Sequence, residues 1–242
     1  MLSSPRETYG PNKIVLAVVA LLGLGGLYLA YAVRDPKTDA LTPGLLVLVL
    51  VAPFVAIFIW LLSVGVTFHE DGITYKSWFG TREIRWGDVE RFYFRAAKRS
   101  INFVPIGTYY YFKLRDRQGG RLSFGNRIAH PSEVGAKLIE YTFKPLLTTA
   151  AQAFDSGAEL DFGEIRVSRG HGLKVKKPAR WYQIGTRVEE IPWNEVADYR
   201  IADGCFYVWR VGQKRTTGPE ISRVPNAFVL KGLLDAVLRP ER

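Results

Sequence analysis

The residues whose types could do chemistry are mainly lysines and arginines, which gather in three short stretches of the chain. Each stretch lies near a turn between expected strands, where several cations can converge on one phosphate group. An anionic membrane surface attracts each well-placed cation by roughly 1 kcal/mol. The stretches are candidate contacts for anionic lipid or a partner, unless they are ordinary solvated charges: Arg95, Lys98 and Arg99; Lys174, Lys176, Lys177 and Arg180; Arg210, Lys214 and Arg215.

Signals of catalysis and metal binding are poor. The three histidines, His69, His130 and His171, are far apart, and none has the partner at helical spacing or the nearby cysteine that a metal site needs. The adjacent carboxylates Glu70 and Asp71 would point to opposite faces of a strand, so they make no acid and base pair. Cys205 is the only cysteine. We therefore expect no catalytic residues, no metal, no cofactor and no enzymatic activity.

The net charge narrows the range of partners. The chain carries a formal charge of +10, nearly all of it after residue 68. A basic surface suits an anionic membrane, a nucleic acid or an acidic protein. Trp181 and Tyr182 beside KKPAR could stack on nucleic acid bases. No nucleic-acid motif accompanies them, so we expect no nucleic-acid partner.

Two apolar segments near the N-terminus predict a transmembrane hairpin. Residues 14–33 and 44–66 contain no charged residue, and each is long enough to cross a hydrocarbon core of roughly 30 Å as a helix. Pro53 predicts a kink in the second helix. The alternative for the first segment is a signal peptide, because AYA at 30–32 resembles a cleavage site. We favour the hairpin, since the apolar run is long and a second one follows directly.

Charge also predicts the orientation of the hairpin. The tail, residues 1–13, is slightly basic, the loop between the spans is balanced, and the rest of the chain is strongly basic. Positively charged flanks stay in the cytoplasm. We therefore predict a multi-pass protein of the inner or plasma membrane, with both termini and the soluble part in the cytoplasm.

A phrase of ten residues occurs twice in the soluble part. EIRWGDVERF at 83–92 returns as EIPWNEVADY at 190–199, an offset of 107 residues. Such a recurrence indicates an internal duplication. Its apolar members are expected in the core, where each tryptophan ring could fill a small barrel or sandwich; stacking on a ligand is the alternative. These residues are Ile84, Trp86, Val89, Ile191, Trp193 and Val196.

The two copies predict two units, residues 67–155 and 156–242. Asp71-Gly72 indicates a tight hairpin turn, and about six short strands are expected in the first unit. Each unit then ends with an amphipathic helix. The first begins near Pro131 and should end or kink at Pro145, and Asn226 is the expected N-cap of the second.

The motif EDGI followed by Tyr75, and then RxIxWxDV at 82–89, resembles bacterial pleckstrin-homology-like domains. The whole chain is similar to an uncharacterised bacterial membrane-protein family with two N-terminal transmembrane helices and such PH-like units. The resemblance implies a strongly bent, seven-stranded sheet capped by a helix in each unit. The expected fold is an α+β membrane protein, with a helical hairpin followed by two tandem PH-like barrels or sandwiches.

These observations favour a binding protein over an enzyme. The leading hypothesis is a membrane-anchored interaction or assembly module that recognises a protein partner at the cytoplasmic face. Exposed sheet edges or loops would bind the partner, including by addition of a strand. The alternative is recognition of anionic phospholipid headgroups through the basic loops between strands.

Overall fold

The computed structural model describes residues 2–32, 41–101, 104–177, 187–202, 204–212 and 216–239. Within them the protein is an α+β fold of four helices and four antiparallel sheets, and none of these sheets closes into a barrel. The chain divides into two compact units, Met1–Arg85 with Asn126–Pro131 and Trp86–Gly125 with Ser132–Arg242. The domain boundaries expected from the sequence stay predictions.

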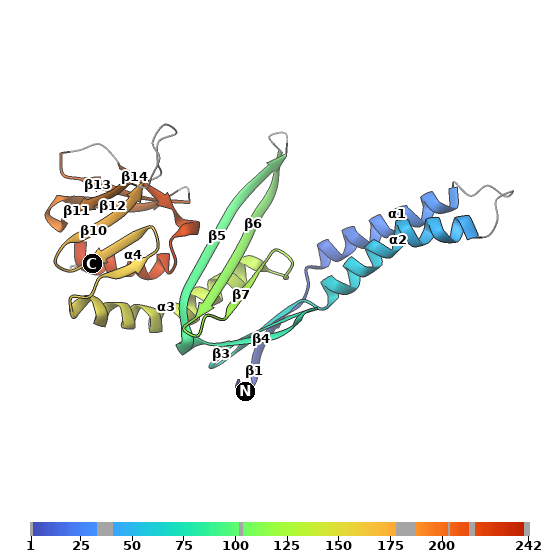
Figure 1. The fold of residues 1–242 in the computed structure, drawn as a ribbon, viewed down its shortest axis with the longest axis horizontal. Coiled ribbons are helices and arrows are strands. Elements are labelled where there is room, and N and C mark those ends of the chain that lie inside the picture. Colours follow the sequence, from blue (N-terminus) through green and yellow to red (C-terminus); the bar gives the residue numbers. More distant parts are fainter. Residues whose placement is uncertain are drawn as a thin grey trace. The chain divides into compact units, whose positions relative to one another are not determined.

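The helices are α1 (Lys13–Ala32), α2 (Leu41–Leu62), α3 (Pro131–Asp155) and α4 (Ala227–Leu238). The first unit holds the sheet β1 (Pro5–Tyr9), β2 (Gly65–His69), β3 (Gly72–Ser77), β4 (Gly80–Arg85) (Figure 1). The second unit holds β5 (Val89–Ile101), β6 (Val104–Asp116), β7 (Arg121–Gly125); then β8 (Leu160–Phe162), β9 (Ile165–Ser168), β10 (Gly172–Lys177), β11 (Arg187–Ile191); and β12 (Val196–Ala202), β13 (Cys205–Arg210), β14 (Thr216–Glu220). Short 3₁₀ turns lie at Trp86–Asp88, Trp193–Glu195 and Ile221–Arg223.

The β1–β4 sheet has one apolar face, built from a single row of inward side chains. Tyr9 pairs with Val66, while Phe68 pairs with Ile73, which pairs in turn with Ile84. All five side chains are buried, because alternate residues of a strand point to the same face. Strand β1 was not expected from the sequence. Four of its five residues are exposed, so it lacks a clear alternating pattern.

The two apolar segments form antiparallel helices, α1 and α2, which leave one end of this sheet together (Figure 1). They pack closely at Gly26, where an added Cβ atom would lie 3.3 Å from the carbonyl oxygen of Leu50. Helix α1 is long and apolar enough to cross a membrane, and the described side chains of α2, Val47–Leu62, form a shorter apolar stretch.

The second predicted span, 44–66, ends earlier in the structure than the sequence indicates. Helix α2 stops at Leu62, and Val66 already belongs to β2. Val66 and Phe68 are apolar because they are core residues of that strand. A prediction from hydropathy therefore included the first residues of β2 in the transmembrane helix.

In the second unit, the β5–β7 sheet packs its aromatic face against the first half of α3. Phe112 is buried and stacks on Phe94, with ring centroids 5.6 Å apart. Gly135 allows the helix to come this close, since a Cβ atom there would lie 2.8 Å from the Phe112 ring. Trp86 is also buried and stacks on Tyr141 of α3, with centroids 5.0 Å apart.

Helix α3 continues ten residues past Pro145, where an end or a kink was expected. Its second half packs into another core through Leu146, Leu147 and Phe154. That core also receives side chains from the β8–β11 sheet, the β12–β14 sheet and α4. One helix therefore completes the hydrophobic packing of both parts of the second unit.

The repeated sequence phrase has the same local structure in both places: a strand, a 3₁₀ turn and a second strand. The indole N–H of Trp193, which is half-buried, donates to the carbonyl oxygens of Ser168 and Arg169, each at 3.0 Å. Its ring meets Phe154 edge-on, with centroids 6.2 Å apart. The remaining apolar members of the phrase are buried: Ile84, Trp86, Val89, Ile191 and Val196.

The equivalence extends far beyond the phrase. Each half of the chain has four antiparallel strands, a 3₁₀ turn, three antiparallel strands and a helix, in that order. Gly72 and Gly172 are equivalent, because a Cβ atom at either would collide with the carbonyl group of Ile84 or Ile191. We call residues 5–155 the first repeat and residues 160–238 the second repeat.

The comparison of the two repeats shows which part of the second repeat corresponds to β1 and where the α1–α2 pair lies. Strand β1 corresponds to β8, the first strand of the second repeat. In the second repeat, β8 and β9 are joined by the two residues Gly163 and Glu164. In the first repeat, α1 and α2 lie between the corresponding strands. The helical pair is therefore an insertion into the first turn of the first repeat.

Residues before the closing helices also correspond. His130 and Asn226, with φ of 50° and 53°, are the non-glycine residues with positive φ in the described part of the chain. Each directly precedes the closing helix of its repeat. Asparagine tolerates this left-handed conformation, which costs other L-residues roughly 1–2 kcal/mol.

Asn226 attaches the second repeat to the edge of β5. Its backbone N–H donates to the carbonyl of Phe92 at 2.7 Å, and its side-chain oxygen accepts from the Phe92 N–H at 2.8 Å. Its side-chain nitrogen donates to the carbonyl of Glu90 at 2.8 Å. Asn226 thereby satisfies backbone groups of β5 that a neighbouring strand would otherwise bind. Asn226 is the N-cap residue of α4, as the sequence predicts, but its side chain bonds to β5 and makes no capping hydrogen bond.

We predict that Asn226→Ala lowers the free energy of unfolding by about 2–4 kcal/mol. The change leaves the Phe92 N–H unsatisfied, removes a second hydrogen bond and forces alanine into the left-handed region. Asn226→Gly should cost about 1–2 kcal/mol less, because glycine adopts that conformation freely. Urea denaturation of the detergent-solubilised chain measures both, with the exposed Asn194→Ala as control. Equal effects of the alanine and glycine variants would contradict the conformational part of this account.

Candidate functional site

Several of the basic candidate residues are held by carboxylates. Arg95 of β5 pairs with Glu220 at 3.3 Å. Lys174 of β10 lies 2.9 Å from Glu159 and 3.8 Å from Glu190. Its hydrogen bond to Glu159 raises the pKa of the Lys174 ammonium. These cations already have local anionic partners, so they are less available to a phosphate group.

Arg210 of β13 is largely buried. Its guanidinium pairs with Glu189 at 2.9 Å and also with Glu195, and 18% of its side chain is exposed. These two carboxylates raise the pKa of the Arg210 guanidinium, Glu195 most strongly. Since Glu189 belongs to β11, the arginine links two sheets of the second repeat and supports its structure.

The other candidates are placed as follows. Lys98 of β5 is exposed, and Lys176 of β10 is half-buried. Arg99 and Lys177 lie within described strands, where only their backbone is described. The remaining three lie outside the described residues: Arg180, Lys214 and Arg215.

A second polar cluster, which the sequence did not reveal, joins β12 to α4. The Tyr199 hydroxyl donates to a carboxylate oxygen of Asp235 at 2.6 Å, and Lys231 donates to the other at 2.6 Å. Burial, followed by the Asp235 hydrogen bond, raises the pKa of the Tyr199 phenol. The Lys231 and Tyr199 hydrogen bonds lower the pKa of the Asp235 carboxyl. The groups satisfy one another, so the cluster is a structural link.

We predict that Asp235 contributes part of the acid sensitivity of the second repeat. Folding lowers the pKa of its carboxyl, so its stabilisation is present above the unfolded value, about 4, and is lost as pH falls through the folded value. Asp235→Asn should be less stable at pH 7 and should converge with the wild type in acid. Urea denaturation at several pH values measures this convergence. Tyr199→Phe should show a smaller effect, and parallel wild-type and Asn curves would refute the assignment.

The possible catalytic groups are dispersed among the described residues. His69 lies 2.8 Å from the carbonyl oxygen of Ser3 and 3.0 Å from the hydroxyl of Thr74. His130 and His171 are exposed at turns. In the described residues, no group of three or more histidine, cysteine, aspartate or glutamate side chains could hold a metal ion. The three histidines therefore lie apart from one another in the part of the chain that the structure describes.

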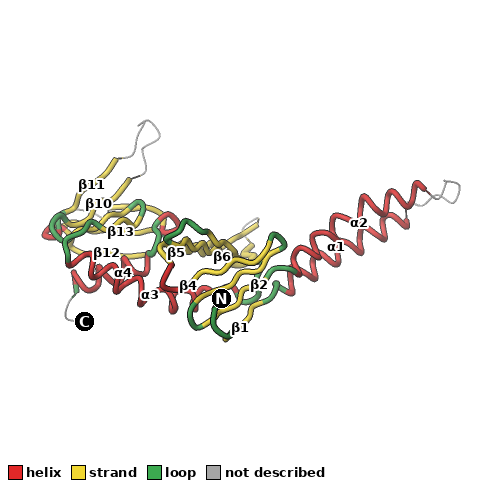
Figure 2. The backbone as a smooth tube through the Cα atoms, turned by 60° about the horizontal axis from the view of Figure 1, so that its bottom comes forward, coloured by secondary structure: helices red, strands yellow, loops and turns green. Residues whose placement is uncertain are grey.

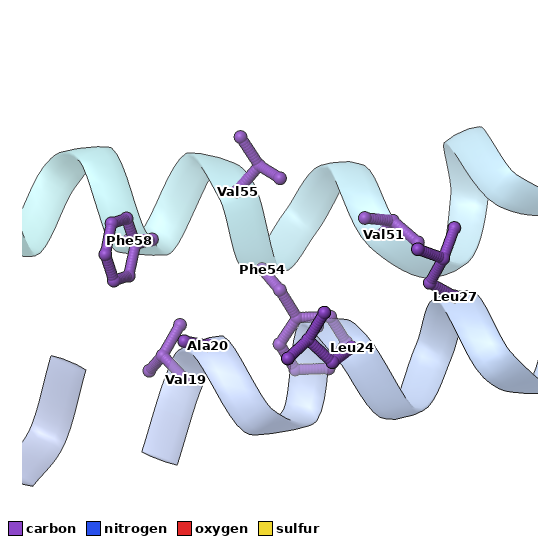
Figure 3. Close-up of a pocket in the computed structure, with 9 residues that line it drawn as sticks. Val19, Ala20, Leu24, Leu27, Val51, Phe54, Val55 and Phe58 are labelled. Carbon is purple, nitrogen blue, oxygen red and sulfur yellow. The ribbon is translucent and has the colours of Figure 1, made fainter. Parts of the chain in front are cut away.

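The described residues of α1 and α2 line an apolar groove of about 340 Å³. Figure 3 shows Phe54 and Phe58 of α2 and Leu24 of α1 among its lining side chains. Substrate sites combine an apolar wall with a few convergent polar groups. All nine lining residues are apolar, so this groove suits hydrocarbon rather than a substrate.

The best candidate for a binding element is the outer part of the β5–β6 hairpin. We call it the ribbon and define it as Ala96–Ile101 of β5 and Val104–Tyr110 of β6. Strand β7 pairs with β6 from Tyr111 to Arg115, so the ribbon extends beyond the three-stranded sheet (Figures 1 and 2). Both β5 and β6 have 13 residues, whereas their counterparts β12 and β13 have 7 and 6. The second repeat folds without such an extension.

The ribbon combines an edge strand with positive charge. In the described sheets, β6 is the strand paired with β5, and Asn226 covers the other edge of β5 at Glu90–Phe92. An edge strand can accept a further strand from a partner. Lys98 and Arg99 lie on the ribbon, and its sequence contains no carboxylate.

The comparison with protein families gives one match, over residues 2–242, to the Family of unknown function (DUF6585). The chain belongs to this family. No curated protein matches it. The DUF6585 match includes β1, the α1–α2 pair and both repeats.

Proposed function

We propose that this protein is a non-enzymatic, membrane-anchored interaction module. Helices α1 and α2 would both cross the membrane, and both termini and both repeats would lie in the cytoplasm. The low charge of the loop between the helices and the basic character of the rest support this orientation. Each repeat would be PH-like, a proposal supported by the order of four strands, three strands and a closing helix.

The partner would be an extended, acidic segment of another protein that pairs with β5 along the ribbon. The observation that carries this proposal is the length of the ribbon compared with the β12–β13 hairpin. Because the described part of the second repeat has the same order of strands without this extension, a binding role accounts for the extension best. Main-chain pairing would supply affinity, while Lys98 and Arg99 would favour an acidic sequence.

Recognition of anionic headgroups has less support, because most of the basic residues expected in loops lie in the strands β5, β10 and β13. Such recognition needs several cations on one phosphate cluster, and Arg95, Lys174 and Arg210 are already paired with carboxylates. Replacing Arg210, whose largely buried guanidinium pairs with Glu189 and Glu195, would also disturb local structure. A loss of lipid binding in such variants would therefore be ambiguous.

We predict that a photo-crosslinking amino acid at Lys98 captures a protein of discrete mass in cells. The same probe at Arg200, an exposed residue of the corresponding strand β12, is the matched control and should capture none. Mass shifts on denaturing gels and mass spectrometry of the adducts provide the measurement. Adducts of lipid mass at Lys98 would favour headgroup recognition instead. The same adducts at both positions, or none at Lys98, would exclude the ribbon as the partner site.

A further inference from the structure

The tip of the β3–β4 hairpin exposes two large aromatic side chains. Trp78 is 60% exposed and Phe79 is 90% exposed. They are the two residues between Ser77 and Gly80, the last pair of this ladder. Adjacent aromatic side chains at the end of a turn contribute nothing to the core of the sheet. Exposed apolar groups of this kind mark contact with a membrane or a protein.

Strand register places this tip beside the base of the helical pair. Lys76 pairs with Gly65, the first residue of β2, so Trp78 lies beyond the start of that strand. Helix α2 ends at Leu62, three residues before Gly65. The aromatic tip therefore lies at the same end of the sheet as the junction between α2 and β2 (Figure 1).

Cations surround this end of the sheet. Lys13 at the start of α1 and Lys76 of β3 are exposed. The guanidinium of Arg127 lies over the ring of Trp60, near the end of α2, at 4.2 Å from its centroid. The carboxylates Glu70 and Asp71 lie at the opposite end, in the turn between β2 and β3.

We propose that the β3–β4 tip inserts Trp78 and Phe79 into the interface of the membrane that α1 and α2 cross. Aromatic side chains concentrate at the level of the lipid headgroups, and Lys13, Lys76 and Arg127 would lie close to lipid phosphates. The inference rests on the membrane anchoring proposed above. It adds a third attachment, which would hold the β1–β4 sheet against the bilayer.

A bilayer fits this surface better than a protein does. The tip lies at the end of the sheet where α2 ends, and the last turns of α2 expose Ile59 and Leu62 at 46% and 52%. The aromatic pair is short and projecting, whereas protein interfaces seat such anchors within a larger patch. The cations around it match the anionic surface of the cytoplasmic leaflet.

The test uses the full chain in lipid nanodiscs, with Cys205→Ser as background and an environment-sensitive fluorophore on one introduced cysteine. The labelled variants are Phe79→Cys at the tip, Glu70→Cys at the opposite end of the same sheet and Leu24→Cys in α1. Glu70 is a suitable control because its ion pair with Arg6 is exposed and contributes little stability. Lipids brominated near the headgroup or near the end of the acyl chain serve as quenchers.

The proposal expects a blue-shifted label at position 79 that headgroup-proximal bromines quench, an unquenched label at position 70 and a label at position 24 that deep bromines quench. Quenching at 24 but not at 79 would overturn the inference and leave the anchor intact. A blue shift at 79 without lipid quenching would mean contact with protein and would also overturn it. No quenching at 24 would refute the membrane anchor itself.

Discussion

The antiparallel pairing of β1 with β2 is the constraint on which the first unit depends. Strand β1 precedes α1 and β2 follows α2, so the pairing of Tyr9 with Val66 brings the start of α1 and the end of α2 to the same end of the sheet. The entropic cost of closing a long insertion grows only slowly with its length. Hydrogen bonds from Asn12 to Arg127 and from Ala129 to Gly10 fix this junction further. Both helices therefore extend from a sheet whose geometry is already fixed by strand pairing and these hydrogen bonds.

Comparison of the two repeats separates features that both share from features that only the first repeat has. Both repeats keep most of the buried positions of the phrase, the glycine that packs against its isoleucine carbonyl and the left-handed residue before the closing helix. These shared features belong to folding. The α1–α2 pair and the ribbon have no counterpart in the described part of the second repeat. They are additions to the arrangement that the two repeats share, which is why the proposals for anchoring and partner binding rest on them.

Much of the fold could be predicted from the sequence, because the signals were local. The apolar runs, the repeated phrase and the hairpin turns indicated two helices and two similar β-rich halves. The sequence does not predict strand β1, because only Tyr9 of its five residues is buried and the strand lacks an alternating apolar pattern. The role of Asn226 depends on β5, more than 130 residues earlier. The carboxylate partners of Arg95 and Arg210 are likewise brought by folding, so composition alone overstated the number of available cations.

The most direct test of the central claim, that the helices are a separable insertion in a duplicated fold, is thermal unfolding of a chain without them. Residues 13–62 would be replaced by a Gly/Ser linker that spans two adjacent helix axes, roughly 8–10 Å apart. Circular dichroism in detergent-free buffer provides the measurement. The account predicts a soluble, β-rich chain with cooperative unfolding. An aggregated chain, or one without a cooperative transition, would show that the helices belong to the fold itself and would contradict the account.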